Sequence, residues 1–314
     1  MTGGVTIAVT TKDRPELTLR AVESARLGAP EARIVVVDSG SAEENLQRLQ
    51  AGLGSIQLHT GAYPNAAAAR NAALGLVDSE FVGFLDSDDL MRAEKITCLR
   101  PLLLRDVTAV LAVGRTGFID AQGRPMHEFS ELQAEHYRES ERIGTSYAGQ
   151  CVRFTAFTSA TLMRRAAVER IGGYDEALPA MEDVDLYLRL SLIGTIATAR
   201  CIAADYRVWT GSVGAVRSAE GIVAVASKHL ANLPIELPRH ERRSSQCGLN
   251  MRAALSLQHL LRASDARRSL VRAARADPVR ALRSRAFWRI FASSLVPRGI
   301  IERRRAASRY SFSP

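Results

Sequence analysis

The sequence Phe84-Leu85-Asp86-Ser87-Asp88-Asp89 directly follows the apolar residues Phe81-Val82-Gly83. This pattern is typical of a buried strand that brings carboxylates to the edge of a sheet, just before a helix begins near Arg92. Carboxylates this close repel one another, so a divalent cation, arginine partners or backbone amides must stabilise them. The position after a hydrophobic strand favours a ligand site; the alternative is an ordinary acidic turn between a strand and a helix.

The segments before this stretch alternate between strand and helix patterns. Apolar, β-branched runs predict strands over residues 5–10, 34–37 and 56–58. Asp13 and Pro15 are predicted to begin the first helix, and Asn65 to cap the Ala-rich helix 66–76. The alternation predicts an α/β fold with a Rossmann-like, mostly parallel sheet flanked by helices.

Polar residues stand at the ends of these predicted strands: Thr10, Thr11, Asp38 and Asp86. Ligands of parallel α/β sheets bind beyond the carboxyl ends of the strands. We therefore expect side chains from three separate segments to converge on one site.

The pattern changes in the middle of the chain. A strand predicted over residues 154–163 follows a polar stretch, residues 127–150, whose length is typical of a binding loop or lid. Glu182 and Asp183 are predicted to begin a helix that extends to about Leu192. Helix capping is the alternative role for these two acids, because the helix dipole favours negative charge there.

The last hundred residues have a helical pattern, with helices predicted over residues 218–232, 249–263, 266–276 and 279–295. A domain boundary is predicted at residue 214, and the change of pattern near residue 105 divides residues 1–214 into two halves. Residues 215–314 are predicted to form an Arg-rich α-helical C-terminal region.

The composition, 46% hydrophobic and 24% charged, is that of a globular protein. No apolar run approaches the roughly 18–20 residues of a membrane-spanning helix, and the N-terminus lacks the features of a signal peptide. The four cysteines have no paired spacing, which predicts neither a zinc site nor a disulfide framework and fits a reducing cytoplasm.

The net charge of +9 is unevenly distributed: residues 239–314, with 18 arginines and four acids, carry +14, and residues 1–238 carry −5. An apolar helical stripe in the tail consists of Phe287, Ile290, Phe291 and Ser294, flanked by Trp288 and Leu295. With the arginines nearby, the stripe is consistent with a peripheral contact to anionic lipid. The other interpretation is a packed helical appendage; nucleic-acid binding is not expected, because no recognised module accompanies the charge.

Residues 4–214 resemble the family 2 glycosyltransferases of the GT-A fold, which are inverting enzymes. The motifs occur in the family's order: Thr10-Thr11-Lys12-Asp13-Arg14-Pro15, Val36-Val37-Asp38-Ser39-Gly40-Ser41, Ala69-Arg70-Asn71-Ala72-Ala73, Phe84-Leu85-Asp86-Ser87-Asp88-Asp89, and Gly172-Gly173-Tyr174-Asp175 with Met181-Glu182-Asp183. One DxD motif is a weak signal, but these motifs in order at plausible spacing are a strong one.

The resemblance implies that residues 1–214 are a GT-A glycosyltransferase domain with a nucleotide-binding half (1–105) and an acceptor-side half (106–214). It also implies a role for each matching position. Thr10, Thr11 and Arg14 would hold the nucleotide, and Asp38 would accept a hydrogen bond from the base. Arg70 and Asn71 would lie near the diphosphate or sugar, Asp86 with Ser87 near ribose or sugar hydroxyls, and Asp88 would bind the metal. Asp183 would be the general base, with Glu182 beside it contacting or orienting the acceptor.

The chemistry needs these residue types. A departing nucleoside diphosphate accumulates negative charge, which Mg²⁺ or Mn²⁺ offsets, and these hard cations prefer carboxylate oxygens such as those of Asp88. Asp183 would take the proton of the acceptor hydroxyl as the new bond forms. Attack from the face opposite the leaving group inverts the anomeric carbon.

One departure from the family pattern is Trp209, which stands where many relatives have a histidine. An indole cannot bind a metal, but it could stack on a sugar ring, so Trp209 and the nearby Arg207 are predicted as weaker sugar or acceptor contacts. Because of Trp209, a catalytically degenerate GT-A protein that acts as a scaffold or binding module is the alternative function.

Two other enzyme classes fit less well. A haloacid dehalogenase-type phosphatase also has a DxD after an apolar strand, but Leu90 stands where that class has Thr or Val. A dinucleotide-binding dehydrogenase needs a glycine-rich turn after the first strand, and Thr10-Thr11-Lys12-Asp13 is not one. The sequence thus predicts a cytoplasmic glycosyltransferase, at the inner face of the membrane if the tail binds lipid, that uses a nucleoside-diphosphate sugar, UDP-linked by preference, and a glycan or lipid-linked acceptor.

Overall fold

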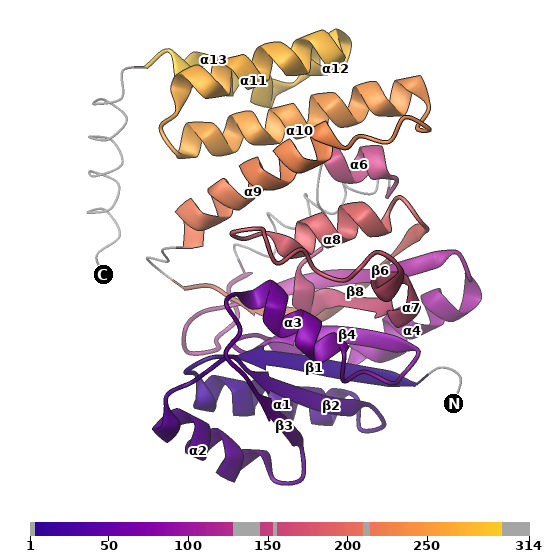
Figure 1. The fold of residues 1–314 in the computed structure, drawn as a ribbon, viewed down its shortest axis with the longest axis vertical. Helices are drawn as coiled ribbons and strands as arrows, with labels where there is room; N and C mark the ends of the chain where they lie inside the picture. Colours follow the sequence, from indigo (N-terminus) through magenta and orange to yellow (C-terminus); the bar gives the residue numbers. More distant parts are fainter. Residues whose placement is uncertain (1–3, 128–144, 153–155, 210–213, 297–314) are drawn as a thin grey trace. The chain divides into compact units, whose positions relative to one another are not determined.

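A computed structural model describes residues 4–127, 145–152, 156–209 and 214–296 (Figure 1). Contacts divide the chain into two compact units, Met1–Ser212 and Val213–Pro314. Most of the polar stretch predicted as a binding loop or lid, residues 127–150, lies outside the described residues. None of the helices in the described ranges combines the length and the apolar character needed to cross a bilayer.

The first unit contains an eight-stranded mixed sheet in the order β3-β2-β1-β4-β7-β6-β8-β5. Its strands are β1 (Val5–Thr11), β2 (Arg33–Asp38), β3 (Gln57–Thr60), β4 (Phe81–Asp86), β5 (Leu90–Met91), β6 (Ala109–Ile119), β7 (Thr161–Arg164) and β8 (Thr195–Arg207). The β3-β2-β1-β4 half is entirely parallel, and β7 is antiparallel to both of its neighbours. The predicted α/β fold with a mostly parallel sheet is confirmed.

Helices cover both faces of this sheet, because successive residues of its buried strands point to opposite sides. Its helices are α1 (Pro15–Gly28), α2 (Glu43–Leu53), α3 (Ala66–Leu74), α4 (Glu94–Arg105), α6 (Tyr147–Val152), α7 (Arg165–Arg170) and α8 (Glu182–Leu190), with a 3₁₀ turn, η1, at Thr158–Ala160. In β1, Ile7 and Val9 pack in the core beneath α1, α2 and α4, and Ala8 packs toward α3, α7 and α8. In Figure 1, α1 and α2 lie below the sheet and α3 and α8 above it.

Register aligns the ends of the strands that carry polar residues. Thr10 of β1 is opposite Asp86 of β4, and Thr11 is opposite Asp38 of β2. The predicted convergence of three segments at one edge of the sheet is therefore present in the backbone.

Two local predictions were wrong. Residues 158–160 form the 3₁₀ turn η1 rather than part of a strand, and β7 is only four residues long. Asp13 does not cap α1: it has φ +53°, and its carboxylate accepts hydrogen bonds from Ala42 N at 2.7 Å and Asn45 Nδ2 at 3.1 Å. Asp13 thereby ties the β1–α1 loop to the start of α2.

The second unit consists of helices α9 (Gly214–Ala231), α10 (Arg239–His259), α11 (Ala263–Ala276), α12 (Pro278–Arg283) and α13 (Arg285–Ser294). The helix predicted over 279–295 is broken at Ser284, whose hydroxyl caps α13 by accepting a bond from Phe287 N. The apolar stripe predicted to meet lipid is divided: Phe287, Ile290 and Ser294 are buried, the first two in a core with α10 and α11. Phe291, Trp288 and Leu295 are exposed, so only this part of the predicted stripe is on the surface.

We predict that Ile290→Ala destabilises the second unit by about 2–5 kcal/mol, because it leaves a cavity in this core. Leu295→Ala, at a position 61% exposed, serves as the control and should cost less than about 0.5 kcal/mol. Chemical unfolding followed by Trp288 fluorescence in a Trp209→Phe background measures both variants. Equal, small losses for the two variants would contradict the inward packing of the stripe.

Candidate active site

Arg70 joins acids from two distant parts of the chain. From α3, its Nη2 donates to Asp86 Oδ1 at 2.7 Å and its Nη1 to Glu182 Oε1. The arginine is only 6% exposed, and its guanidinium carbon lies 5.6 Å from the ring centre of Tyr174. Burial alone would lower the pKa of Arg70, but the two carboxylates more than reverse this and raise its pKa. The ion pairs bring Asp86 at the end of β4 to the first turn of α8.

Asp183, next to Glu182, is half-buried in the same first turn. Its Oδ2 accepts a bond from Thr158 Oγ1 at 3.1 Å, and its Oδ1 accepts one from Val184 N at 2.8 Å. Burial and the charge of Glu182 raise the pKa of Asp183 to about 6, against the opposing effect of Arg70. Such a carboxylate is ionised at neutral pH and is a better proton acceptor than an exposed aspartate.

The turn η1 contributes two residues that the sequence analysis did not single out. Ser159 Oγ donates to Asp89 Oδ2 at 2.6 Å and accepts from Asp86 N at 3.1 Å, while its neighbour Thr158 binds Asp183. Adjacent side chains of one turn therefore hold both acidic segments. The available signal was the adjacent hydroxyls Thr158 and Ser159, but the predicted strand would have sent them to opposite faces.

The third acid of the motif, Asp89, is structural rather than the start of the next helix. It is 1% exposed, and its Oδ1 accepts from Arg207 N at 3.0 Å. Burial and the nearby charge of Asp86 raise the pKa of Asp89, and its hydrogen bonds oppose this. Arg207 was expected near the sugar or acceptor, but it is buried and donates to the carbonyls of Asp88, Asp120 and Ala121. It therefore fixes the turn that presents Asp88.

Asp88 lies between Arg14 and Trp209. Arg14 Nη1 lies 2.6 Å from Asp88 Oδ2, and Trp209 Nε1 donates to the same oxygen at 3.0 Å. The indole that replaces the usual histidine thus contacts the predicted metal ligand through its N–H. With an exposed fraction of 41%, its ring remains available for stacking.

The residues of β1 and β2 that were predicted to contact the nucleotide form hydrogen bonds within the chain. The buried hydroxyl of Thr11 lies 2.6 Å from that of Thr18. Asp38 is 1% exposed, and its Oδ2 accepts from Gly40 N at 3.1 Å and Ser41 N at 3.0 Å. A base that bound the Asp38 carboxylate would compete with these loop contacts. The structure places Thr10 half-buried at the end of β1 and Ser87 buried beside Asp88.

The side chain of Asn71 forms hydrogen bonds with the loop that contains Tyr174 and Glu176. Its Nδ2 donates to Tyr174 O at 2.9 Å and Glu176 Oε1 at 2.8 Å, and its Oδ1 accepts from Tyr174 N at 2.8 Å. The loop passes so close that a Cβ at Gly173 would lie 2.6 Å from Asn71 Oδ1. The predicted contact of Asn71 with the diphosphate would therefore have to replace these bonds.

The described residues contain no group of three or more potential metal-ligating side chains. Asp88 is nevertheless suited to a hard divalent cation. Arg14 and Trp209 both contact its Oδ2, and its Oδ1 has no hydrogen-bond or ion-pair partner among the described residues. Mg²⁺ at phosphate sites is commonly held by one or two carboxylates together with phosphate oxygens and water. The donor set fits such an ion, with Asp86 as the neighbouring carboxylate.

A mostly parallel sheet flanked by helices, with carboxylates at the ends of its strands near an acidic pair on a helix, is consistent with a GT-A fold. The chain belongs to the family described as glycosyltransferase like family 2, whose sequence profile matches residues 5–216. This membership decides against the phosphatase and dehydrogenase interpretations.

Two bacterial relatives support the family assignment. The pre-mycofactocin glycosyltransferase of Mycobacterium tuberculosis is 29% identical over 160 residues, covering 50% of this chain and 33% of that protein. The succinoglycan biosynthesis protein ExoU of Rhizobium meliloti is 31% identical over 198 residues, covering 59% of this chain and 56% of that protein. The matched regions thus span a third to just over half the length of these relatives.

Solved structures share the fold at low sequence identity. Mannosyltransferase PcManGT from Pyrobaculum calidifontis, in complex with GDP-Man and Mn²⁺, has a TM-score of 0.61 at 16% identity, covering 92% of this chain and 83% of that one. S. aureus TarS 1–349, in complex with UDP-GlcNAc, has a TM-score of 0.57 at 15% identity, covering 92% and 91%.

We predict that Gly173→Ala destabilises the first unit more than Gly172→Ala does. Both glycines have positive φ, +70° and +80°, but a Cβ at Gly172 has no neighbour within 4 Å. Gly172→Ala should show only the conformational cost, about 1 kcal/mol, and Gly173→Ala a further 1–2 kcal/mol from the contact with Asn71. Asn71→Ala in the Gly173→Ala background, measured in denaturant, should cost less than Asn71→Ala alone; additive losses would contradict the contact.

Proposed function

We propose that the protein is an inverting, metal-dependent glycosyltransferase that transfers a sugar from a nucleoside-diphosphate sugar, UDP-linked by preference, to a hydroxyl group. The observation that carries this proposal is the buried bridge from Arg70 to Asp86 and Glu182, because it joins the donor-side acid to the predicted base segment. The family membership and the nucleotide-sugar complexes of the structural neighbours support it.

In this proposal, Asp183 accepts the proton of the acceptor hydroxyl as its oxygen bonds to the anomeric carbon. The bond from that carbon to the diphosphate oxygen breaks on the opposite face, and its electron pair leaves with the nucleoside diphosphate. Glu182 keeps the pKa of Asp183 high, and Arg70 holds Glu182 in place. Thr158 orients the Asp183 carboxylate toward the site.

On the donor side, Asp88 and Asp86 would hold Mg²⁺ or Mn²⁺, which offsets the charge that develops on the diphosphate. Arg14 and Trp209 orient Asp88 through one oxygen. Thr10, Thr11 and the Asp38 loop form the strand ends against which the nucleotide would lie. Arg14 is 49% exposed at its side chain and would add positive charge near the phosphates.

The acceptor that we propose is a glycan or lipid-linked saccharide of the cell envelope, handled in the cytoplasm. One relative is a succinoglycan biosynthesis protein, which supports a saccharide acceptor. Arg14 and Trp209 both contact the carboxylate of Asp88, and these contacts also favour a second candidate function. In it, the protein binds the donor weakly and acts as a scaffold. Turnover and metal-dependent donor binding distinguish the two.

Replacing the proposed base tests the mechanism directly. Asp183→Asn should retain donor affinity and lose about 10²–10⁴-fold in kcat, because general base catalysis is lost. Isothermal titration with UDP and Mn²⁺ and a transfer assay measure the two effects. Turnover near that of the wild type would remove Asp183 from this role.

The pH dependence of kcat/KM should follow from the ionisation of Asp183. A base with a pKa of about 6 is protonated below that pH, so kcat/KM should fall about tenfold per unit as pH decreases below 6. Glu182→Gln removes a negative charge that raises this pKa, so the midpoint should move to lower pH. A rate profile that is flat from pH 5 to 8, or an upward shift in Glu182→Gln, would contradict the assignment.

The metal assignment predicts that Asp88→Ala abolishes the Mn²⁺-dependent part of UDP binding, seen by calorimetry with and without EDTA. Asp78→Ala is a matched control, because Asp78 is 78% exposed at its side chain and pairs with Arg33. Unchanged affinity in Asp88→Ala would exclude Asp88 as a ligand. If no UDP-, GDP- or dTDP-sugar stabilises the wild type with Mn²⁺, the scaffold function is favoured.

A further inference from the structure

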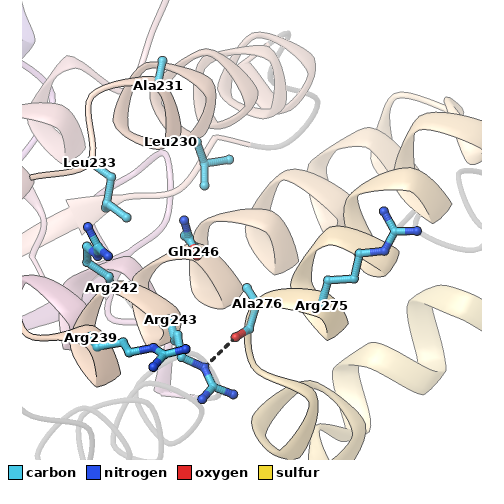
Figure 2. A pocket seen from close by; sticks show the side chains of 9 residues that line it. All are labelled: Leu230, Ala231, Leu233, Arg239, Arg242, Arg243, Gln246, Arg275 and Ala276. Atoms are coloured by element: carbon cyan, nitrogen blue, oxygen red, sulfur yellow. Dashed lines mark hydrogen bonds between the residues drawn. The ribbon is translucent and has the colours of Figure 1, made fainter. Parts of the chain in front are cut away.

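The second unit contains an open cavity of about 700 Å³ between the end of α9, the start of α10 and the end of α11 (Figure 2). Its lining residues are Leu230, Ala231, Leu233, Arg239, Arg242, Arg243, Gln246, Arg275 and Ala276. Four of these nine residues are arginines, and none is acidic. The volume is within the range of about 300–1,000 Å³ that is usual for small-molecule sites.

Three of the arginines lie on one face of α10, because Arg239, Arg242 and Arg243 are spaced three and four residues apart. Figure 2 shows them beside Gln246, with Leu230 and Leu233 on the neighbouring segment. Like charges at this spacing repel one another. They also stand at the helix N-terminus, where the dipole disfavours cations.

Among the described residues no acidic side chain lines the pocket, and the acid in the first turn of α10, Glu241, is not part of its lining. Within the described ranges, Arg239, Arg242 and Arg275 form no ion pair, and Arg243 Nε donates to Ala276 O at 2.9 Å. Asp277, next to Ala276, caps α12 through Arg280 N and lies 3.7 Å from Arg280 Nε. The guanidinium groups of Arg239 and Arg242 are therefore available to a ligand.

We propose that this arginine pocket binds a phosphate ester or diphosphate, a ligand site separate from the donor site at the sheet edge. A guanidinium donates two parallel hydrogen bonds to a phosphate, so two or more closely spaced phosphate charges match the pocket. Gln246 provides an amide for a neutral polar group, and Leu230 and Leu233 provide an apolar wall. The phosphate can come from a soluble diphosphate or from a lipid headgroup.

The test compares two double variants of the full chain that remove the same charge. Arg239→Gln/Arg242→Gln changes the pocket, and Arg272→Gln/Arg289→Gln removes two exposed arginines of the same unit that do not line it. Removing the pocket arginines relieves repulsion, so the melting temperature should not fall. Arg239→Lys/Arg242→Lys, which keeps the charge but loses the planar fork, is the second pocket variant.

Inorganic pyrophosphate is titrated calorimetrically at about 0.15 M salt in EDTA, because the proposed donor site needs a divalent cation and the arginine pocket does not. Vesicles of phosphatidylglycerol, with phosphatidylcholine as control, test the lipid source by co-sedimentation. The Gln pocket variant should bind at least tenfold more weakly than the wild type, the Lys variant should be intermediate, and the Arg272/Arg289 variant should be unchanged.

Selective loss of pyrophosphate binding supports the site with a soluble ligand, and selective loss of vesicle binding supports it with a lipid headgroup. Equal losses in the two Gln variants would show non-specific attraction to the basic unit and overturn the proposal. Absence of binding by the wild type to either probe would also overturn it. Neither result depends on glycosyl transfer, so the proposed function is tested separately.

Discussion

The ion pairs of Arg70 with Asp86 and Glu182 are the constraint on which the active site depends. A buried guanidinium is costly without counter-charges, and carboxylates at the end of a strand and at a helix N-terminus would repel each other without it. Each partner therefore requires the others. Residues 112 positions apart, Arg70 and Glu182, are held in contact at the point where β4, α3 and α8 meet.

Around this bridge, a buried polar network holds the acidic turn in place. Ser159, Arg207 and Thr158 satisfy oxygens of Asp89 and Asp183, and Lys95 of α4 donates to Phe84 O at 3.3 Å beneath the turn. Burial lowers the pKa of Lys95 to about 7, while the charges of Asp86 and Asp89 act against this. Such a network rigidifies a site when each of its members is satisfied. It leaves Asp86, Asp88 and Asp183 as the acids placed to meet a ligand.

The two units differ in how their acidic and arginine side chains are paired. In the first, acids and arginines form close ion pairs, such as Arg70 with Asp86 and Arg189 with Asp185. In the second, arginines outnumber acids. At the start of α10, arginines line a pocket that has no acidic residue among its described lining. Phe287 and Ile290 pack in the interior of this unit, while Trp288, Phe291 and Leu295 remain exposed beside its arginines.

Local sequence patterns determined the parallel half of the sheet, its covering helices, the Asn65 cap and the edge at which polar residues gather, because alternating burial and capping are properties of neighbouring residues. They did not reveal β8, η1 or the break at Ser284, where pairing partners and packing outweigh weak local preferences. Nor could they separate ligand-facing polar residues from structural ones. Binding sites often contain residues of the same types as Asp13, Asn71, Asp89 and Arg207. Each of these four instead forms hydrogen bonds with residues 29 to 118 positions away in the sequence. Only tertiary structure decides such contacts, because they depend on which strand ends and loops the fold brings together.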